Sequence, residues 1–162
     1  MIDIYTDGAC RGNPGPGGYG VMVKQNGYTK TFAQGYRKTT NNRMELLAVI
    51  IGLEALQQTA QAVTVYSDSK YVVDAIEKGW LKNWLKIDFK AKKNPDLWKR
   101  FWIVYQKHLV HFCWVKGHAG HHENERCDRL AVASSYNNLL IDTYYENSIY
   151  TGLCKSSKRL QD

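Results

Sequence analysis

The fold of this chain is decided by a stretch near its beginning, Ile2-Asp3-Ile4-Tyr5-Thr6-Asp7-Gly8. Its side chains alternate with a period of two, which is typical of a β-strand with the two isoleucines and the threonine on one face. The strand ends on a carboxylate, Asp7. Residues 63–68 (VTVYSD) repeat this layout and end on Asp68. Two strands that each deliver an acid at the carboxyl end predict a shared site, provided that the fold brings those ends together.

Length and composition indicate one globular domain. The chain has 162 residues, of which 44 % are hydrophobic, enough for a sizeable core. Its longest apolar run, 46–53, is too short to cross a membrane, and we see no basic-then-apolar leader. The four cysteines (Cys10, Cys113, Cys127 and Cys154) show no paired spacing. We therefore expect reduced thiols, a cytoplasmic location and a monomer.

The positive charge is concentrated in one part of the chain. Of a net charge of +7, residues 78–100 carry +6, from eight basic and two acidic side chains. We call these residues the basic segment. A lysine run alone is usually a solvated surface, but here aromatic residues are interleaved with the cations, which favours a nucleic-acid partner. The aromatic residues in question are Trp80, Trp84, Phe89 and Trp98.

The first third of the chain predicts a three-stranded meander. Residues 12–18 (GNPGPGG) are expected to form a turn and no regular element. Strands are expected over 19–24 and 28–37, joined by Asn26-Gly27, which is a strong hairpin signal. The third strand then runs parallel to the first.

A buried helix is expected to follow the meander. The helix is expected over residues 42–58, and its core, residues 44–53, is apolar nearly all round, as in a crossover helix. A right-handed crossover makes strand 63–68 parallel to the first strand, so that Asp7 and Asp68 lie at the same edge of the sheet. Further elements are then expected in chain order: helices over 69–78 and from residue 95, a strand over 109–115, a loop over 117–122, a helix over 123–136, and a polar, mobile tail from residue 155.

Each acid of the expected site also has a plainer explanation. Glu45 could complete a capping box with Asn42, and Asp68 could cap the helix that follows it. Asp7 precedes a glycine, as in many turns, and Asp128 could be a solvated helix residue beside arginines. The case for a site rests on convergence, because the topology brings Asp7, Asp68 and the helix start that carries Glu45 to one end of the sheet.

Such a group of carboxylates predicts a metal site. Acids close together repel one another unless they are protonated or neutralised by a cation. Oxygen ligands favour Mg²⁺ or Mn²⁺ over zinc. Beside a basic surface this suggests phosphodiester chemistry, in which two ions roughly 4 Å apart activate water and stabilise the leaving oxygen.

A glycine-rich and histidine-rich loop, 116–122 (KGHAGHH), is expected to reach the same site. Its His118 could carry protons near the metal. The alternatives are a solvent-exposed histidine or a zinc ligand. Zinc is the weaker interpretation, because the chain has no Cys-x-x-Cys pair and the spacing fits no common zinc module.

Together these motifs resemble bacterial ribonuclease HI, the type 1 RNase H family. The resemblance covers residues 1–146 and leaves 147–162 as a partly mobile extension. It is carried by long, ordered stretches: 5–10 (YTDGAC), 12–20 (GNPGPGGYG), 40–46 (TNNRMEL), 67–69 (SDS), 115–121 (VKGHAGH) and 123–128 (ENERCD).

The resemblance implies an α/β fold, the RNase H-like fold, whose five-stranded mixed sheet has the order 3-2-1-4-5 and is flanked by helices. It implies hydrolysis of the RNA strand of RNA–DNA hybrids with two Mg²⁺ ions, Mn²⁺ being a possible substitute, to give 5′-phosphate and 3′-hydroxyl ends. The metal-binding residues would be Asp7, Glu45, Asp68 and Asp128, with His118 assisting proton transfer or product release. The substrate contacts would be Cys10, Asn13, Asn41, Asn42, Trp80, Trp84, Lys90, Lys92 and Lys93, the basic segment gripping the DNA strand.

Two other classes of function stay open at this point. The chain could be a hybrid-binding module without catalysis, although all four acids and the loop histidine are present. It could also be a related polynucleotidyl transferase or DNA nuclease with the same sheet, although the Asn41-Asn42 and His118 motifs argue against that. Measuring binding and cleavage of RNA–DNA hybrids beside duplex DNA would distinguish these possibilities.

Overall fold

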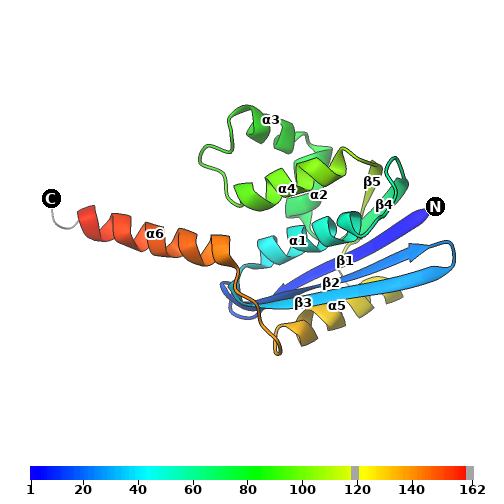
Figure 1. Cartoon of the computed structure of the whole chain (residues 1–162), viewed down its shortest axis with the longest axis horizontal. Helices are drawn as coiled ribbons and strands as arrows, with labels where there is room; N and C mark the ends of the chain where they lie inside the picture. Colours follow the sequence, from blue (N-terminus) through cyan, green and yellow to red (C-terminus); the bar gives the residue numbers. More distant parts are fainter. Residues whose placement is uncertain (118–120, 160–162) are drawn as a thin grey trace.

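The computed structural model describes residues 1–117 and 121–159, with side chains as far as residue 152, and it has a mixed sheet at its centre. The five strands lie in the order β3-β2-β1-β4-β5, which confirms the expected topology (Figure 1). The strands are β1 (Ile2–Cys10), β2 (Gly15–Gln25), β3 (Tyr28–Thr39), β4 (Ala62–Ser67) and β5 (Leu109–Trp114).

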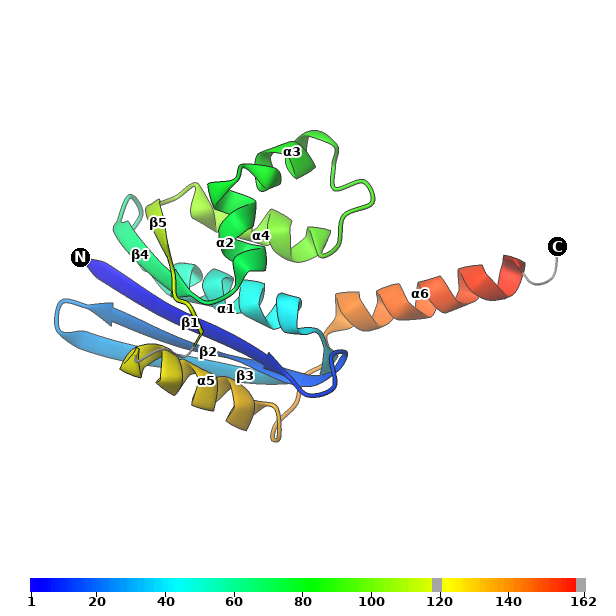
Figure 2. The same ribbon diagram turned by 180° about the vertical axis from the view of Figure 1, so that it is seen from behind.

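Helices cover both faces of the sheet. α1 packs on β1 and β2 and contacts α4, while α5 covers the opposite face of β1, β2 and β3 (Figure 2). α6 projects away from this body. The helices are α1 (Asn41–Glu54), α2 (Lys70–Glu77), α3 (Trp80–Lys86), α4 (Pro95–Tyr105), α5 (His122–Ser134) and α6 (Thr143–Arg159). Within the described residues, no helix is both long enough and apolar enough to cross a bilayer.

Strand β1 holds the sheet together, because it is antiparallel to β2 and parallel to β4. Its register places Tyr5 opposite Tyr66, and the two rings stack with centroids 4.6 Å apart. Asp7 and Asp68 each come two residues later in the chain, so both reach the same edge of the sheet. The expected juxtaposition of the two acids is confirmed.

The prediction that residues 12–18 form only a turn was wrong. β2 already begins at Gly15, and Gly17 and Gly18 pair with Cys10 and Ala9 of β1. The glycines serve close packing here, because a Cβ on Gly18 would lie 2.7 Å from the carbonyl oxygen of Ala131 in α5. Glycine therefore marks the place where a helix lies against the sheet, and the strand continues through it.

Helix α1 begins earlier and ends earlier than expected. Its N-cap is Thr40, whose hydroxyl accepts a hydrogen bond from the backbone N–H of Arg43 (3.2 Å), so Asn42 is not the cap. The helix ends at Glu54, before the expected boundary near residue 58. Its interior is buried nearly all round, as the apolar sequence predicted.

The carboxyl-terminal part also differs from expectation. We expected a polar, mobile tail from residue 155 and no helix there, and α6 continues through Arg159. The helix starts after Asp142, whose side chain accepts from the backbone N–H of Tyr145 (3.3 Å) and whose carbonyl accepts from Glu146 (2.9 Å). α6 thus runs across position 146, where the sequence suggested a boundary. The division into a domain over 1–146 and an extension stays a prediction.

A buried ion-pair network ties this helix to the body. The Arg43 guanidinium, in α1, contacts Asp142 before α6 and Asp96 in α4, each at 2.7 Å. Thr39 at the end of β3 donates to the same Asp142 carboxylate (2.7 Å). One arginine therefore joins α1, α4, β3 and the start of α6 through charges that are largely withdrawn from water.

We expect Arg43→Ala to lower the free energy of unfolding by about 3–5 kcal/mol, since it leaves the buried Asp142 carboxylate without its cation. Urea denaturation at neutral pH measures the loss. Arg37→Ala is the matched control: it breaks the exposed Arg37–Glu146 pair to the same helix and should change stability little. Equal effects of the two substitutions would contradict a structural role for the buried network.

Candidate active site

Three carboxylates converge at the edge of the sheet where β1 and β4 end. Asp7 lies in β1, Glu45 in α1 and Asp68 directly after β4. One oxygen from each lies within 4.8 Å of the others. Asp7 and Glu45 are only 4 % and 5 % exposed, and Asp68 is half-buried. Such a set of oxygens suits a hard divalent cation.

The plainer explanations of these three acids do not fit the structure. Glu45 lies beyond the first turn of α1, so it forms no capping box. The cap of α2 is Ser69, whose hydroxyl accepts from Val72 N (3.3 Å), and not Asp68. Asp7 lies within a strand and is part of no turn. The acids are therefore not explained by local backbone requirements.

A close contact between β1 and α1 brings Asp7 and Glu45 together. A Cβ on Gly8 would lie 2.4 Å from the backbone nitrogen of Glu45, so any other residue would push the helix away. The backbone N–H of Gly8 also donates to the Asp7 carboxylate (2.9 Å). Glycine is thus needed at position 8 for the approach of the helix, and the backbone N–H of this residue orients Asp7.

The electrostatics of the cluster favour a cation. Burial, reinforced by the charges of Asp68 and Asp128, raises the pKa of Asp7 to about 8. Burial and then the charges of Asp7 and Asp68 raise the pKa of Glu45 well above its ordinary value. Glu45 Oε2 is buried and has no hydrogen-bond partner among the described residues. An unsatisfied buried oxygen among like charges fits a metal ligand.

The other two expected catalytic residues are Asp128 and His118. Asp128 lies half-buried in α5, close enough for its charge to raise the pKa of Asp7, but it is outside the group within 4.8 Å. His118 lies outside the described residues. Its loop leads into α5, which begins at His122 and carries Asp128.

The expected polar contacts lie around the turn between β1 and β2 and the start of α1. Asn13 Oδ1 accepts from the backbone N–H of Asn41 (3.0 Å), which fastens this turn to the helix start. Burial raises the pKa of the Cys10 thiol, which donates to the carbonyl oxygen of Thr39 (3.4 Å). Asn42 is exposed beside them. The four residues therefore share one surface.

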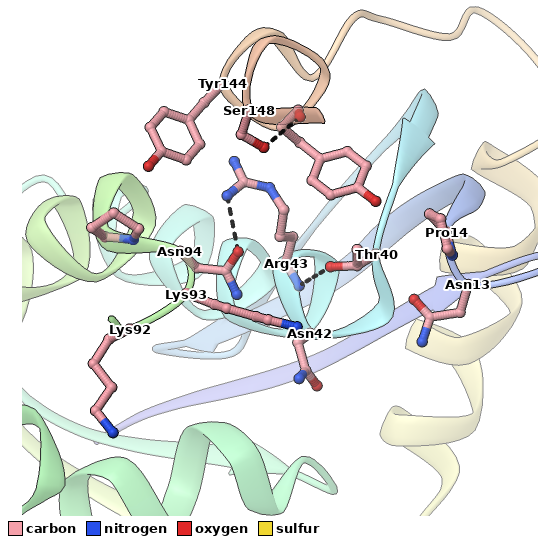
Figure 3. Close-up of a pocket in the computed structure, with 12 residues that line it drawn as sticks. Asn13, Pro14, Thr40, Asn42, Arg43, Lys92, Lys93, Asn94, Tyr144 and Ser148 are labelled. Carbon is pink, nitrogen blue, oxygen red and sulfur yellow. Dashed lines mark hydrogen bonds between the residues drawn. The ribbon is translucent and has the colours of Figure 1, made fainter. Parts of the chain in front are cut away.

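A cavity of about 490 Å³ opens beside these residues (Figure 3). Four of the contacts expected from the sequence line it: Asn13, Asn42, Lys92 and Lys93. The other lining residues were missed. Thr40 could have been found as a helix cap, and Arg43 as a charge inside an apolar helix, but no sequence signal pointed to residues of α6. The missed lining residues are Pro14, Thr40, Arg43, Asn94, Pro95, Tyr144, Tyr145 and Ser148.

The aromatic residues of the basic segment do not all face solvent, contrary to expectation. Trp98 is 0 % and Phe89 4 % exposed, so both belong to the core. Trp98 packs edge-on against Trp84, which in turn lies beside Trp80. Lys92 lies over the Trp84 ring and Lys78 over Trp80, at 5.8 and 5.2 Å from the centroids. The two outer tryptophans therefore support lysines.

The cations of the basic segment are only partly neutralised. Lys99 pairs with Asp88 (3.2 Å), and Arg100 donates to Glu54 (3.0 Å). Lys90 and Lys93 are exposed and form no ion pair with the part of the chain that the structure describes. The remaining positive charge thus lies on α3 and on the loop between α3 and α4, where Lys92 and Lys93 line the cavity.

Comparisons with known proteins agree with this geometry. The RNase H family model matches residues 1–136. Ribonuclease H of Desulforamulus reducens is 57 % identical over 139 residues, covering 83 % of this chain and 87 % of its own. Ribonuclease H of Escherichia coli is 49 % identical over 151 residues, covering 90 % and 96 %.

Solved structures show the same architecture. LC9-RNase H1, a type 1 RNase H, matches with a TM-score of 0.73 and 34 % identity, covering 83 % of this chain and 71 % of that one. LC11-RNase H1 in complex with an RNA/DNA hybrid matches with a TM-score of 0.63 and 28 % identity, covering 83 % and 96 %. With a family match over most of its length and relatives of this identity, the chain belongs to the RNase H family.

Proposed function

We propose that this protein is a ribonuclease H that hydrolyses the RNA strand of RNA–DNA hybrids and leaves 5′-phosphate and 3′-hydroxyl ends. The observation that carries the proposal is the group of carboxylates at a sheet edge beside a basic surface: Asp7 and Glu45, which are buried, and Asp68, which is half-buried. Membership of the RNase H family and likeness to an RNase H1 solved with an RNA/DNA hybrid support it.

In this proposal Asp7, Glu45, Asp68 and Asp128 hold two Mg²⁺ ions, for which Mn²⁺ can substitute. When bound, the ions supply an activated water and charge stabilisation at the leaving oxygen. The carboxylates would hold the ions in place, and burial of Asp7 and Glu45 keeps bulk solvent away from these two ligands. His118 assists proton transfer or product release. We place this chemistry in the cytoplasm, in keeping with the cysteines Cys10, Cys113 and Cys127, which form no disulfide.

The two strands of the hybrid would be read by different surfaces. Asn13, Asn41, Asn42 and Cys10 lie around the β1–β2 turn and the start of α1 and are suited to the 2′-hydroxyls of the RNA strand. Trp80, Trp84 and the lysines of the basic segment would hold the DNA strand through its phosphates. This division explains why one molecule needs both an amide-rich surface and a cationic one.

We expect Asp7→Asn to abolish cleavage while hybrid binding is largely kept, because the substitution removes a metal ligand and leaves the basic segment intact. The measurement is metal-dependent cutting of a labelled hybrid, beside single-stranded RNA, double-stranded RNA and duplex DNA. Asp3→Asn, four residues earlier in β1, is the control and should cut normally. Retained turnover in Asp7→Asn would refute the site. Tight hybrid binding without cutting by the parent protein would favour the non-catalytic module.

The raised carboxylate pKa values predict an unusual pH dependence of stability. Between the unfolded pKa near 4 and the folded pKa of Asp7, about 8, the folded state binds more protons than the unfolded state. Stability of the metal-free protein should therefore fall as pH rises through this window. We expect Asp7→Asn to flatten the fall and to be more stable than the parent at pH 8, by at least about 1 kcal/mol.

Denaturant unfolding in a chelating buffer at pH 5 and pH 8 checks this expectation. Mg²⁺ should stabilise the parent at pH 8 and should stabilise Asp7→Asn much less, since binding to the folded state alone raises stability. If the free energy of unfolding depended on pH in the same way in the parent and in Asp7→Asn, burial of the Asp7 carboxylate would not lower stability, and the expectation would be wrong.

Neutralising exposed lysines of the basic segment should weaken hybrid binding and lower its salt dependence. For the double substitution Lys90→Gln and Lys93→Gln we expect the slope of log K against log salt to fall by about 2, because each neutralised lysine displaces one counterion fewer from the phosphates. Fluorescence anisotropy over a salt series measures the slope. Lys30→Gln with Lys107→Gln, on β3 and after α4, is the charge-matched control. An unchanged slope in the first pair would mean that the basic segment faces away from the substrate.

A further inference from the structure

We propose that helix α6 forms part of the substrate-binding surface, its Tyr144 and Ser148 lying against the sugar–phosphate backbone of the DNA strand. The inference rests on the proposed function and adds to it a binding surface outside the region matched by the family model, residues 1–136.

The cavity of Figure 3 has two facing walls. One wall belongs to the loop after α3 and carries Lys92, Lys93 and Asn94. The other belongs to α6 and carries Tyr144 and Ser148, while α1 forms the floor between them. Without α6 the lysines would border an open surface. With it they border a trough of about 490 Å³.

The chemistry of the trough suits a phosphodiester. Its lining consists of cationic, amide, hydroxyl and proline side chains, with no carboxylate among the lining residues. Arg43 in the floor is neutralised by Asp96 and Asp142, so the charge available to a ligand is that of Lys92 and Lys93. Phenol, amide and ammonium donors around two lysines match the oxygens of a sugar–phosphate chain.

The start of α6 is attached to the body through Asp142, which pairs with the buried Arg43 (2.7 Å). Arg37 pairs with Glu146 (3.0 Å), and the Arg43 guanidinium lies over the Tyr144 ring, 5.4 Å from its centroid. Ser148 donates back to the carbonyl of Tyr145 (2.7 Å), so its short side chain stays close to the helix. A ligand can therefore approach this wall closely, and the wall is in place before binding.

A second hollow continues the trough outward along α6. Its volume is about 400 Å³, and it shares Tyr144 and Ser148 with the first. Asn147, Thr151 and Gly152 line the rest. The two hollows together form a polar path from Lys92 and Lys93 along the projecting helix. An extended polyanion follows such a path better than a compact anion does.

The DNA strand is the better occupant of this path. None of the three clustered acids lines the trough. Asn13 and Asn42, which we assign to the RNA strand, border it at the β1–β2 turn and at α1, whereas the walls of Lys92, Lys93 and α6 are left for the other strand (Figure 3). Lys92 and Lys93 belong to the basic segment, which we assign to the DNA strand. The trough continues that surface onto α6.

Two substitutions of identical charge on the same helix test the inference. Ser148→Glu puts a carboxylate on the wall of the trough, whereas Tyr150→Glu puts it at a position 72 % exposed that lines neither hollow. In an Asp7→Asn background, we expect Ser148→Glu to weaken hybrid binding by about tenfold and Tyr150→Glu by less than about twofold. Ser148→Lys should tighten binding. Equal effects of the two glutamates would overturn the inference.

Hybrids with uncharged methylphosphonate linkages identify the strand. Neutral linkages in the DNA strand should abolish the difference between Ser148→Glu and Tyr150→Glu, and neutral linkages in the RNA strand should leave it. The reverse result would overturn the assignment to DNA. Tyr144→Phe removes only a hydroxyl, and a loss of binding of roughly two- to fivefold is expected even if Ser148→Glu folds poorly.

The inference and the proposed function fail in different ways. If the parent protein does not cut the RNA of a hybrid, the proposed function is wrong. If the parent cuts and the two glutamate variants bind alike, only the role of α6 is wrong.

Discussion

The repulsion among Asp7, Glu45 and Asp68 is the constraint on which the rest of this structure depends. Their oxygens lie within 4.8 Å of one another, and burial raises the pKa of Asp7 to about 8. A fold can hold such a cluster only if its backbone is fixed independently. Here β1 is hydrogen-bonded on both sides, and α1, which carries Glu45, is buried nearly all round. The packing of the core thus offsets the unfavourable free energy of the repulsion among these carboxylates.

A buried group of opposite charge lies a short distance along α1. Arg43, two residues before Glu45, is as deeply buried but is fully paired with Asp96 and Asp142. One helix therefore carries a buried carboxyl oxygen without a hydrogen-bond partner, which suits a metal, and a fully paired buried charge that holds α4 and α6 in place. The group without a partner therefore suits a ligand-binding site, whereas the paired group is a structural contact that is complete within the chain.

The basic segment combines packing and binding in one row of aromatic rings. Trp98 lies in the core, Trp84 packs on it, and Trp80 reaches the surface. Lysines lie over the two outer rings, so the position of the charge depends on the packing below. The proposed nucleic-acid-binding surface is therefore positioned by the core beneath it, and the α6 wall borders this surface on the far side.

Local patterns of the sequence predicted the three-stranded meander, the shared edge of Asp7 and Asp68 and the buried nature of α1, because alternation, apolar periodicity and short turns are local signals. The full strand order 3-2-1-4-5 was implied only by the resemblance to the RNase H family. The local patterns misjudged Gly15–Gly18, Phe89 and Trp98, because whether a glycine lies in a strand or a tryptophan in the core depends on what packs against it. Only the tertiary structure decided that Gly8 lets Glu45 approach Asp7, that Arg43 joins four elements and that α6 faces Lys92 and Lys93. Those contacts join residues far apart in the chain, and no local pattern encodes a distance between them.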